Sequence, residues 1–147
     1  MGINIGLDIG AISLKLAALG KTQDRPALDS LCAAHPKFRL SELNGAPLVL
    51  SDYSRIAGSP IQSTYDLLQE IYETIPEDRI EGIRVTGSGS RTIAKVLGLF
   101  FENEFKAIAR TMATLYPHAR TVFEIGGESS KYIRLEGSSI VDYDRSG

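Results

Sequence analysis

Cysteine is nearly absent from the 147-residue sequence, and this scarcity removes two classes of protein at the outset. Cys32 is the only cysteine. A single thiol cannot form a disulfide framework within the chain, and it cannot by itself ligate zinc or an iron–sulfur cluster. We therefore expect no thiolate metal centre built from this chain alone, and we expect Cys32 to be a small apolar residue in a strand.

Excess positive charge and long apolar runs are also missing. The 16 Lys and Arg residues face 18 Asp and Glu, for a net charge of -2, and no basic cluster offsets this balance. That composition argues against an electrostatic grip on nucleic acid or anionic lipid. No apolar run approaches the length of a membrane span, and no leader is visible. We expect a soluble, cytoplasmic protein with neither a nucleic-acid nor a membrane partner.

The sequence also lacks a histidine metal site and a recognisable catalytic nucleophile. His35 and His118 stand far apart, with no cysteine or paired acid at ligand spacing, so we assign them no metal role. Ser88, Ser90 and Ser129 lack a histidine and an aspartate in a recognisable nucleophile setting, which argues against serine hydrolase chemistry.

What the sequence does contain is an alternation of strand and helix patterns. Apolar periodicity predicts helices over residues 61–75, 91–97 and 101–116, the first of them with Ser59 as N-cap and Pro60 in its first turn. Strands are predicted over residues 3–9, 12–19, 48–53, 82–86, 121–125, 131–135 and 139–143. Residues 28–35 fit either a strand or a short helix, and we favour the strand. This order predicts an α/β fold.

One short motif occurs twice. D-I-G-x-x-S-x-K at residues 8–15 returns as E-I-G-x-x-S-x-K at residues 124–131. In such a turn, glycine amides can point at phosphate oxygens, serine adds a donor, lysine adds charge, and the carboxylate can hold Mg²⁺ directly or through water. Two facing turns would clamp a polyphosphate. The alternative is that the acids are solvated strand ends and the lysines lie on exposed strand faces.

The repeat also predicts a duplicated, two-lobed architecture. We expect residues 1–120 to form a first lobe, with a mixed sheet and packed helices, and residues 121–147 to start a second lobe. The polar ending VDYDRSG supplies no helix to cover the three new strands. We therefore expect the second lobe to be incomplete and the chain to be part of a longer protein.

The two hairpins resemble the phosphate hairpins of the superfamily that joins acetate kinase, sugar kinases, the heat-shock chaperone ATPases and actin. The closer resemblance is to the ATPase activators of 2-hydroxyacyl-CoA dehydratases and benzoyl-CoA reductases. It rests on both hairpins together with YSRIAGSP (residues 53–60), IRVTGSGSRTIAKVLG (83–98) and NEFKAIARTMATLYPHARTVFEIGG (103–127), in the family's order. The resemblance implies an actin-like, ribonuclease H-like ATPase lobe with a mixed sheet.

The same resemblance implies roles for individual residues. It makes Asp8 and Glu124 catalytic, and Asp8 a ligand of Mg²⁺ through phosphate or water. The implied nucleotide phosphate contacts are Gly10, Ser13, Lys15, Gly126, Gly127 and Lys131. Gly87, Gly89 and Arg91 match a further glycine turn of the family.

In that family, ATP hydrolysis changes the shape of a homodimer that holds one [4Fe-4S] cluster, and an electron is driven onto the dehydratase or reductase. The implied cofactors are ATP and Mg²⁺, with a cluster that this chain does not ligate. In the family the cluster cysteines and the adenosine-binding residues lie beyond the position of Gly147. We expect ATPase activity of the full-length parent and none of this chain alone.

Two departures from the family pattern matter. The family usually has Asp at the position of Glu124, and the extra methylene displaces the carboxylate by roughly 1 Å, which weakens the case for hydrolysis more than for binding. Ala11 and Ile12 replace two hydroxyl residues and predict weak nucleotide affinity. Two alternatives stay open: a lobe of a small-molecule kinase, and a degenerate, non-catalytic nucleotide-binding scaffold.

Overall fold

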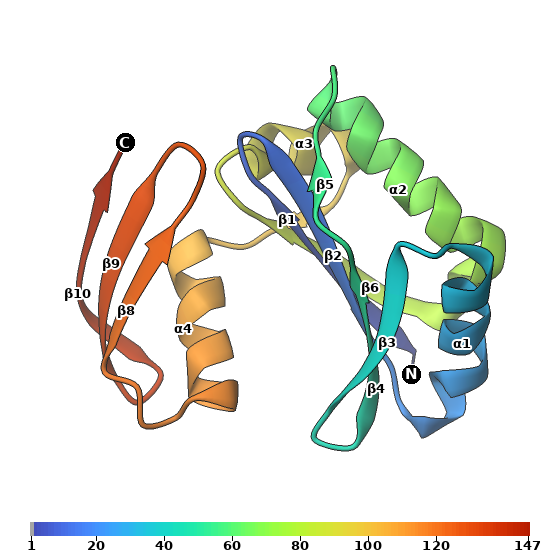
Figure 1. Ribbon diagram of the computed structural model, residues 1–147, viewed down its shortest axis with the longest axis horizontal. Helices are drawn as coiled ribbons and strands as arrows, with labels where there is room; N and C mark the ends of the chain where they lie inside the picture. The colour runs from blue at the N-terminus through green and yellow to red at the C-terminus, as the bar shows by residue number, and fades with distance from the viewer. Residues whose placement is uncertain (1) are drawn as a thin grey trace.

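The computed structural model describes residues 2–147, which form two β-sheets and the helices packed on them (Figure 1). The helices are α1 (Arg25–Ala34), α2 (Pro60–Thr74), α3 (Ser90–Leu97) and α4 (Glu104–Leu115), with short 3₁₀ turns η1 (Thr22–Asp24) and η2 (Glu77–Arg79). The strands are β1 (Ile3–Ile9), β2 (Ser13–Leu19), β3 (Phe38–Leu43), β4 (Ala46–Ser51), β5 (Ser54–Arg55), β6 (Ile80–Thr86), β7 (Phe100–Phe101), β8 (Thr121–Ile125), β9 (Ser130–Glu136) and β10 (Ser139–Ser146).

The first sheet is mixed, in the order β3-β4-β2-β1-β6-β7, with β5 also paired to β2. β1 pairs antiparallel with β2 and parallel with β6, so it lies in the middle of the sheet. The alternate residues of β1 from Ile3 to Ile9 are buried, whereas Asn4, Gly6 and Asp8 between them are exposed. Because strand side chains alternate between faces, Asp8 lies on the face opposite the core.

All of the first three helices pack on the core face of this sheet. Leu28 of α1, Ile71 of α2 and Ile93 of α3 belong to the same hydrophobic cluster as Leu7 and Ile9 of β1. Each such fully buried aliphatic side chain contributes about 1.5–3 kcal/mol relative to exposure. The opposite face of β1, which carries Asp8, is therefore left accessible.

Residues 28–35, for which the sequence favoured a strand over a short helix, lie in helix α1 up to Ala34 and do not form a strand. Pro26 lies in the first turn of the helix, and its buried residues Leu28 and Leu31 are spaced by three, which is the period of a helix face. Cys32 is consequently half-buried on a helix and not in a strand. The apolar run was too short for its period to separate the two structures.

The second sheet has the order β10-β9-β8 and is covered on one face by α4 (Figure 1). Ala109 of α4 forms a separate hydrophobic cluster with Ile133 and Leu135 of β9, joined by the half-buried Phe105 and Met112. The expectation that no helix covers these strands is therefore wrong for this face. The helix that covers it precedes residue 120, and the lobe boundary at that residue stays a prediction.

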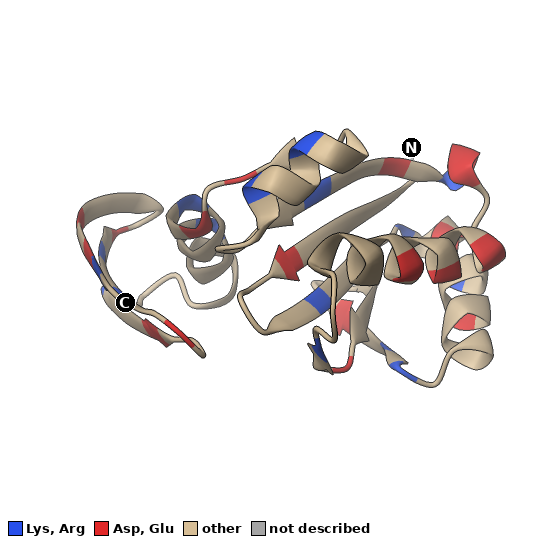
Figure 2. Ribbon diagram, turned by 90° about the horizontal axis from the view of Figure 1, so that it is seen from above, with Lys and Arg blue, Asp and Glu red and all other residues tan. Residues whose placement is uncertain are grey.

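Charges are spread over both sheets and their helices, and neither sign occupies one continuous stretch of ribbon among residues 2–147 (Figure 2). Within the same residues, every helix falls short of the length and apolarity that a bilayer-spanning helix needs.

Candidate functional site

The first hairpin, β1 to β2, places an acid and a lysine side by side behind a glycine turn. Asp8 and Lys15 are directly opposite each other in the β1–β2 register. Lys15 Nζ lies 3.1 Å from Asp8 Oδ2, and the two side chains are 43% and 50% exposed. Lys15 Nζ also donates to Ser13 Oγ at 3.4 Å, and Gly10 N closes the turn by donating to Ser13 O at 2.9 Å. The pair is therefore formed but open to solvent.

A third loop, between β6 and α3, packs against the same turn. Gly89 N donates to Ile9 O at 3.1 Å. Gly87 has a φ of +109°, and a Cβ there would lie 2.2 Å from Ile9 O and 2.8 Å from Asp8 Oδ1. Only glycine fits this position, for both reasons. The backbone of the loop thus borders Asp8 directly and helps to fix its position.

The second hairpin, β8 to β9, repeats the geometry of the first. Glu124 and Lys131 are opposite each other in the register, and Lys131 Nζ donates to Glu124 Oε2 at 2.8 Å. Gly126 N donates to Ser129 O at 2.8 Å, as Gly10 N does to Ser13 O in the first turn. The repeated motif therefore folds into repeated structure.

The surroundings of the second pair differ, because α4 covers this face of the sheet. The Lys131 side chain is only 3% exposed, and its Nζ also lies 2.9 Å from Glu104 Oε2, at the start of α4. Glu104 is held in turn by Arg145. Burial alone would lower the pKa of Lys131, but its hydrogen bonds with Glu124 and Glu104 outweigh this and raise it. Burial alone would raise the pKa of Glu104, but Lys131 and Arg145 hold it below its ordinary value.

The two glycine turns meet at one edge of the molecule, where the β1–β2 and β8–β9 turns lie side by side at the top of Figure 1. A Cβ on Gly127 would lie 2.5 Å from Ile12 Cδ1, so the Ile12 side chain rests directly on the glycine backbone. The amides of Ala11, Ile12, Gly127 and Glu128 donate no backbone hydrogen bond within residues 2–147. Unused donors from both turns therefore lie at one place.

The structure places the predicted site residues in two groups. Asp8, Gly10, Ser13 and Lys15 lie on the first hairpin, and Glu124, Gly126, Gly127 and Lys131 on the second. Arg91, which matched the family's third turn, stacks on the Phe101 ring with 4.5 Å between its Cζ and the ring centroid. Glu104 and Arg145 were not predicted from the sequence: the packing of α4 brings Glu104 to Lys131, and the β9–β10 register places Arg145 opposite Lys131.

The residues present fit a phosphate-bound Mg²⁺ but not an iron–sulfur cluster. Within residues 2–147, no three acidic, histidine or cysteine side chains gather into a metal cage. Mg²⁺ needs only one or two carboxylates when phosphates and water complete its shell. Asp8 is accessible, and the buried Thr86 hydroxyl, opposite Asp8 in the β1–β6 register, has no partner among the described residues. A [4Fe-4S] cluster requires several thiolates, and Cys32 is the only one.

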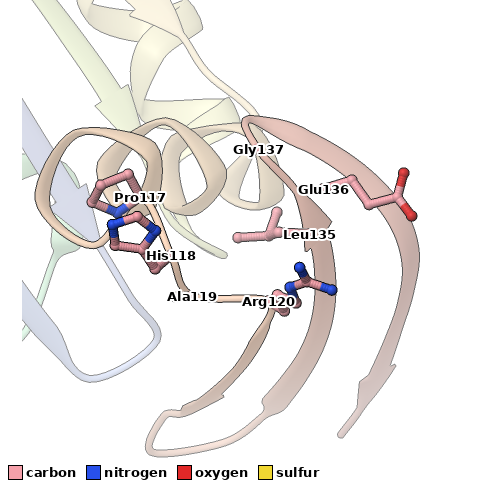
Figure 3. A pocket seen from close by; sticks show the side chains of 7 residues that line it. All are labelled: Pro117, His118, Ala119, Arg120, Leu135, Glu136 and Gly137. Carbon is pink, nitrogen blue, oxygen red and sulfur yellow. The ribbon is translucent and has the colours of Figure 1, made fainter.

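A pocket formed by residues 117–120 and 135–137 lies away from the turns (Figure 3). It sits at the start of β8, whereas the glycine turn follows the end of this strand, roughly 15 Å farther along. Figure 3 shows the Glu136 carboxylate pointing away from His118 and Arg120. No converging set of catalytic groups lines this pocket.

Comparison with known proteins supports the fold and not a family. No family model matches the sequence, and no curated protein matches it. Solved structures do match. Component A of (R)-2-hydroxyglutaryl-CoA dehydratase from Acidaminococcus fermentans superposes with a TM-score of 0.62 at 16% identity, over 99% of this chain and 48% of its own.

Two further structures extend the comparison. The activator of the 2-hydroxyisocaproyl-CoA dehydratase from Clostridium difficile, with bound ADPNP, has a TM-score of 0.61 at 18% identity, over 98% of this chain and 45% of its own. A Ppx/GppA family member from Aquifex aeolicus has a TM-score of 0.59 at 15% identity, over 99% and 51%. The chain thus has the actin-like ATPase fold and spans about half the length of these neighbours.

Proposed function

We propose that this chain is the phosphate-binding part of an ATP-dependent activator that couples ATP hydrolysis to electron transfer onto a CoA-ester dehydratase or reductase. The observation that carries the nucleotide part is the doubled acid–lysine hairpin, whose glycine turns meet with unused amide donors between them. The activator part is supported by two of the structural neighbours and by the ordered sequence motifs.

The proposed chemistry assigns each group at the turns a task. Turn amides donate to phosphate oxygens, and Lys15 moves from Asp8 toward the phosphate as charge arrives. Asp8 would hold a hydrated Mg²⁺, whose charge would offset that of the phosphates. Lys131 stays with its two carboxylates, because a phosphate would have to compete with both. Glu124, one of these two carboxylates, is the proposed residue for positioning the attacking water.

The experiment is a titration of the ¹⁵N-labelled chain with Mg²⁺–tripolyphosphate and, separately, with Mg²⁺–ADPNP. We expect millimolar binding of both, with shifts at the Gly10, Gly126 and Gly127 amides and no detectable ATP hydrolysis, because the neighbours bring about twice this length of chain. Unchanged spectra at saturating ligand would contradict the proposal.

The activator role needs its own test in the protein that contains this chain. After anaerobic purification, ATP should drive reduction of a 2-hydroxyacyl-CoA dehydratase. Phosphoryl transfer to a small-molecule hydroxyl without a cluster would favour the kinase alternative. The burial of Lys131 between two acids favours a second candidate, a nucleotide-binding scaffold, and ADPNP binding without ATP turnover in the whole protein would establish it.

A further inference from the structure

Ile12 breaks the symmetry between the two hairpin turns. The repeat aligns residues 10–13, G-A-I-S, with residues 126–129, G-G-E-S, so that Ile12 corresponds to Glu128. Glu128 is exposed, as expected for the tip of a turn, whereas Ile12 is half-buried. An aliphatic side chain at the tip of a turn is unusual unless something covers it.

What covers Ile12 is the second turn. Its Cδ1 and Cγ1 would lie 2.5 and 3.0 Å from a Cβ on Gly127, so only glycine permits this approach. The contact joins the β1–β2 turn of the first sheet to the β8–β9 turn of the second. Elsewhere at this edge the turns offer backbone amides and charged side chains, so Ile12 supplies an apolar contact between two otherwise polar surfaces.

This contact lies where a phosphate shared by the two turns would have to approach. A phosphate bound by amides of both turns must lie within about 2.7–3.2 Å of each donor, with the phosphoryl group between them. The Ile12 side chain, which rests on the Gly127 backbone, occupies space that such a phosphoryl group would need. The contact must break before both turns can hold one phosphoryl group.

We propose that Ile12 is a gate residue, whose contact with Gly127 closes the gap between the turns and sets a threshold for binding a terminal phosphoryl group. The inference rests on the proposed nucleotide function. A chain of three phosphates has to enter between the turns and is opposed by the gate. Inorganic phosphate can bind at one turn alone and is little affected.

The test begins with the contact itself, which can be measured without any ligand. In the free chain we expect a nuclear Overhauser effect between the Ile12 δ1 methyl and the Gly127 α protons. The same effect should disappear when Mg²⁺–tripolyphosphate saturates the turns. Its absence in the free chain would overturn the gate and leave the proposed nucleotide site standing. Its persistence in a chain saturated at both turns would do the same.

The matched variants are Ile12→Val, which removes only the Cδ1 methyl, and Ile93→Val, which makes the same change in the core. Because the lost methyl contact is a cost of opening, Ile12→Val should bind Mg²⁺–tripolyphosphate about fivefold more tightly, and Ile93→Val should match the wild type. Inorganic phosphate affinity should be nearly equal in all three proteins. Equal tripolyphosphate affinity of Ile12→Val and the wild type would overturn the gate. Failure of every protein to bind either anion would overturn both the gate and the proposed site.

Discussion

The two hairpins carry one motif in two different environments. Lys15 is 43% exposed and has one carboxylate partner, whereas Lys131 is 3% exposed and lies between two. The backbone registers are equivalent, so the difference arises from what covers each sheet. α4 packs on the acid–lysine face of the second sheet, and no described helix packs on the corresponding face of the first. The same residues thus form an accessible pair in one place and a structural cluster in the other.

Replacing each lysine by methionine should show the largest difference between the pairs. In Lys131→Met, Glu124 loses its cation and Glu104 keeps only Arg145, which should cost about 2 kcal/mol of unfolding free energy. The estimate is below that for fully buried pairs, because both carboxylates keep some contact with water. Lys15→Met should cost about 0.5 kcal/mol or less. Urea unfolding followed by circular dichroism measures both, and equal losses would contradict the distinction.

Removing the acids should have the larger effect at the first hairpin when binding is measured, whereas removing the lysines has the larger effect on stability at the second. Asp8→Asn keeps the shape and removes the exposed charge that would hold Mg²⁺, so affinity for Mg²⁺–tripolyphosphate should fall about tenfold or more. Glu124→Gln should cost about twofold, because that carboxylate is engaged with the buried Lys131. Calorimetry compares the two, with the exposed helix residue Asp29→Asn as control. An Asp8→Asn chain that binds like the wild type would show Asp8 to be a solvated strand end.

The sequence predicted the hairpins well because their determinants are local. Motif spacing and glycine placement define the turn, and the pairing of Asp8 with Lys15 and of Glu124 with Lys131 then follows from strand register. The actin-like fold was predicted from the ordered motifs and is confirmed by the solved structures. The exposure of the two lysines depends on which sheet α4 covers, and no local pattern encodes that choice.

Two misses have the same physical origin. The segment that forms α1 has apolar residues compatible with a strand or a helix, and packing of Leu28 and Leu31 against the first sheet decides between them. The contact of Ile12 with Gly127 joins positions 115 residues apart, as the sequence numbering gives, and exists only when the two sheets are placed together. Tertiary contacts determine both features.

Low pH should weaken the ion pairs around Lys131 by protonating Glu104. Its pKa is lowered on folding from an ordinary value of 4.5, so its contribution to stability is present above that pH and is lost as pH falls through the lower, folded-state pKa. Between about pH 6 and about pH 3.5, the wild type should therefore lose about 0.5–1 kcal/mol more than Glu104→Gln.

Urea unfolding at both pH values provides the measurement for Glu104. Burial would raise the pKa of Asp24, but Lys21 N–H and Arg79 lower it below its ordinary value. Asp24 is present in both proteins, so its contribution cancels from the difference. A wild type and variant that lose stability in parallel would show that Glu104 gains nothing from Lys131.

High salt should weaken the Asp8–Lys15 pair and leave the Glu124–Lys131 pair nearly unchanged, which is the smallest effect expected here but the one most specific to exposure. A double-mutant cycle on Asp8 and Lys15 should give a coupling of about 0.5 kcal/mol at low salt, in the range of exposed pairs. At about 1 M NaCl the screening length falls to about 3 Å, so this coupling should approach zero. The cycle on Glu124 and Lys131 should keep most of its coupling, because the lysine is 3% exposed and ions cannot surround it. Couplings that decline in parallel with salt would mean that α4 does not shield Lys131 in solution, and the contrast between the hairpins would then be lost.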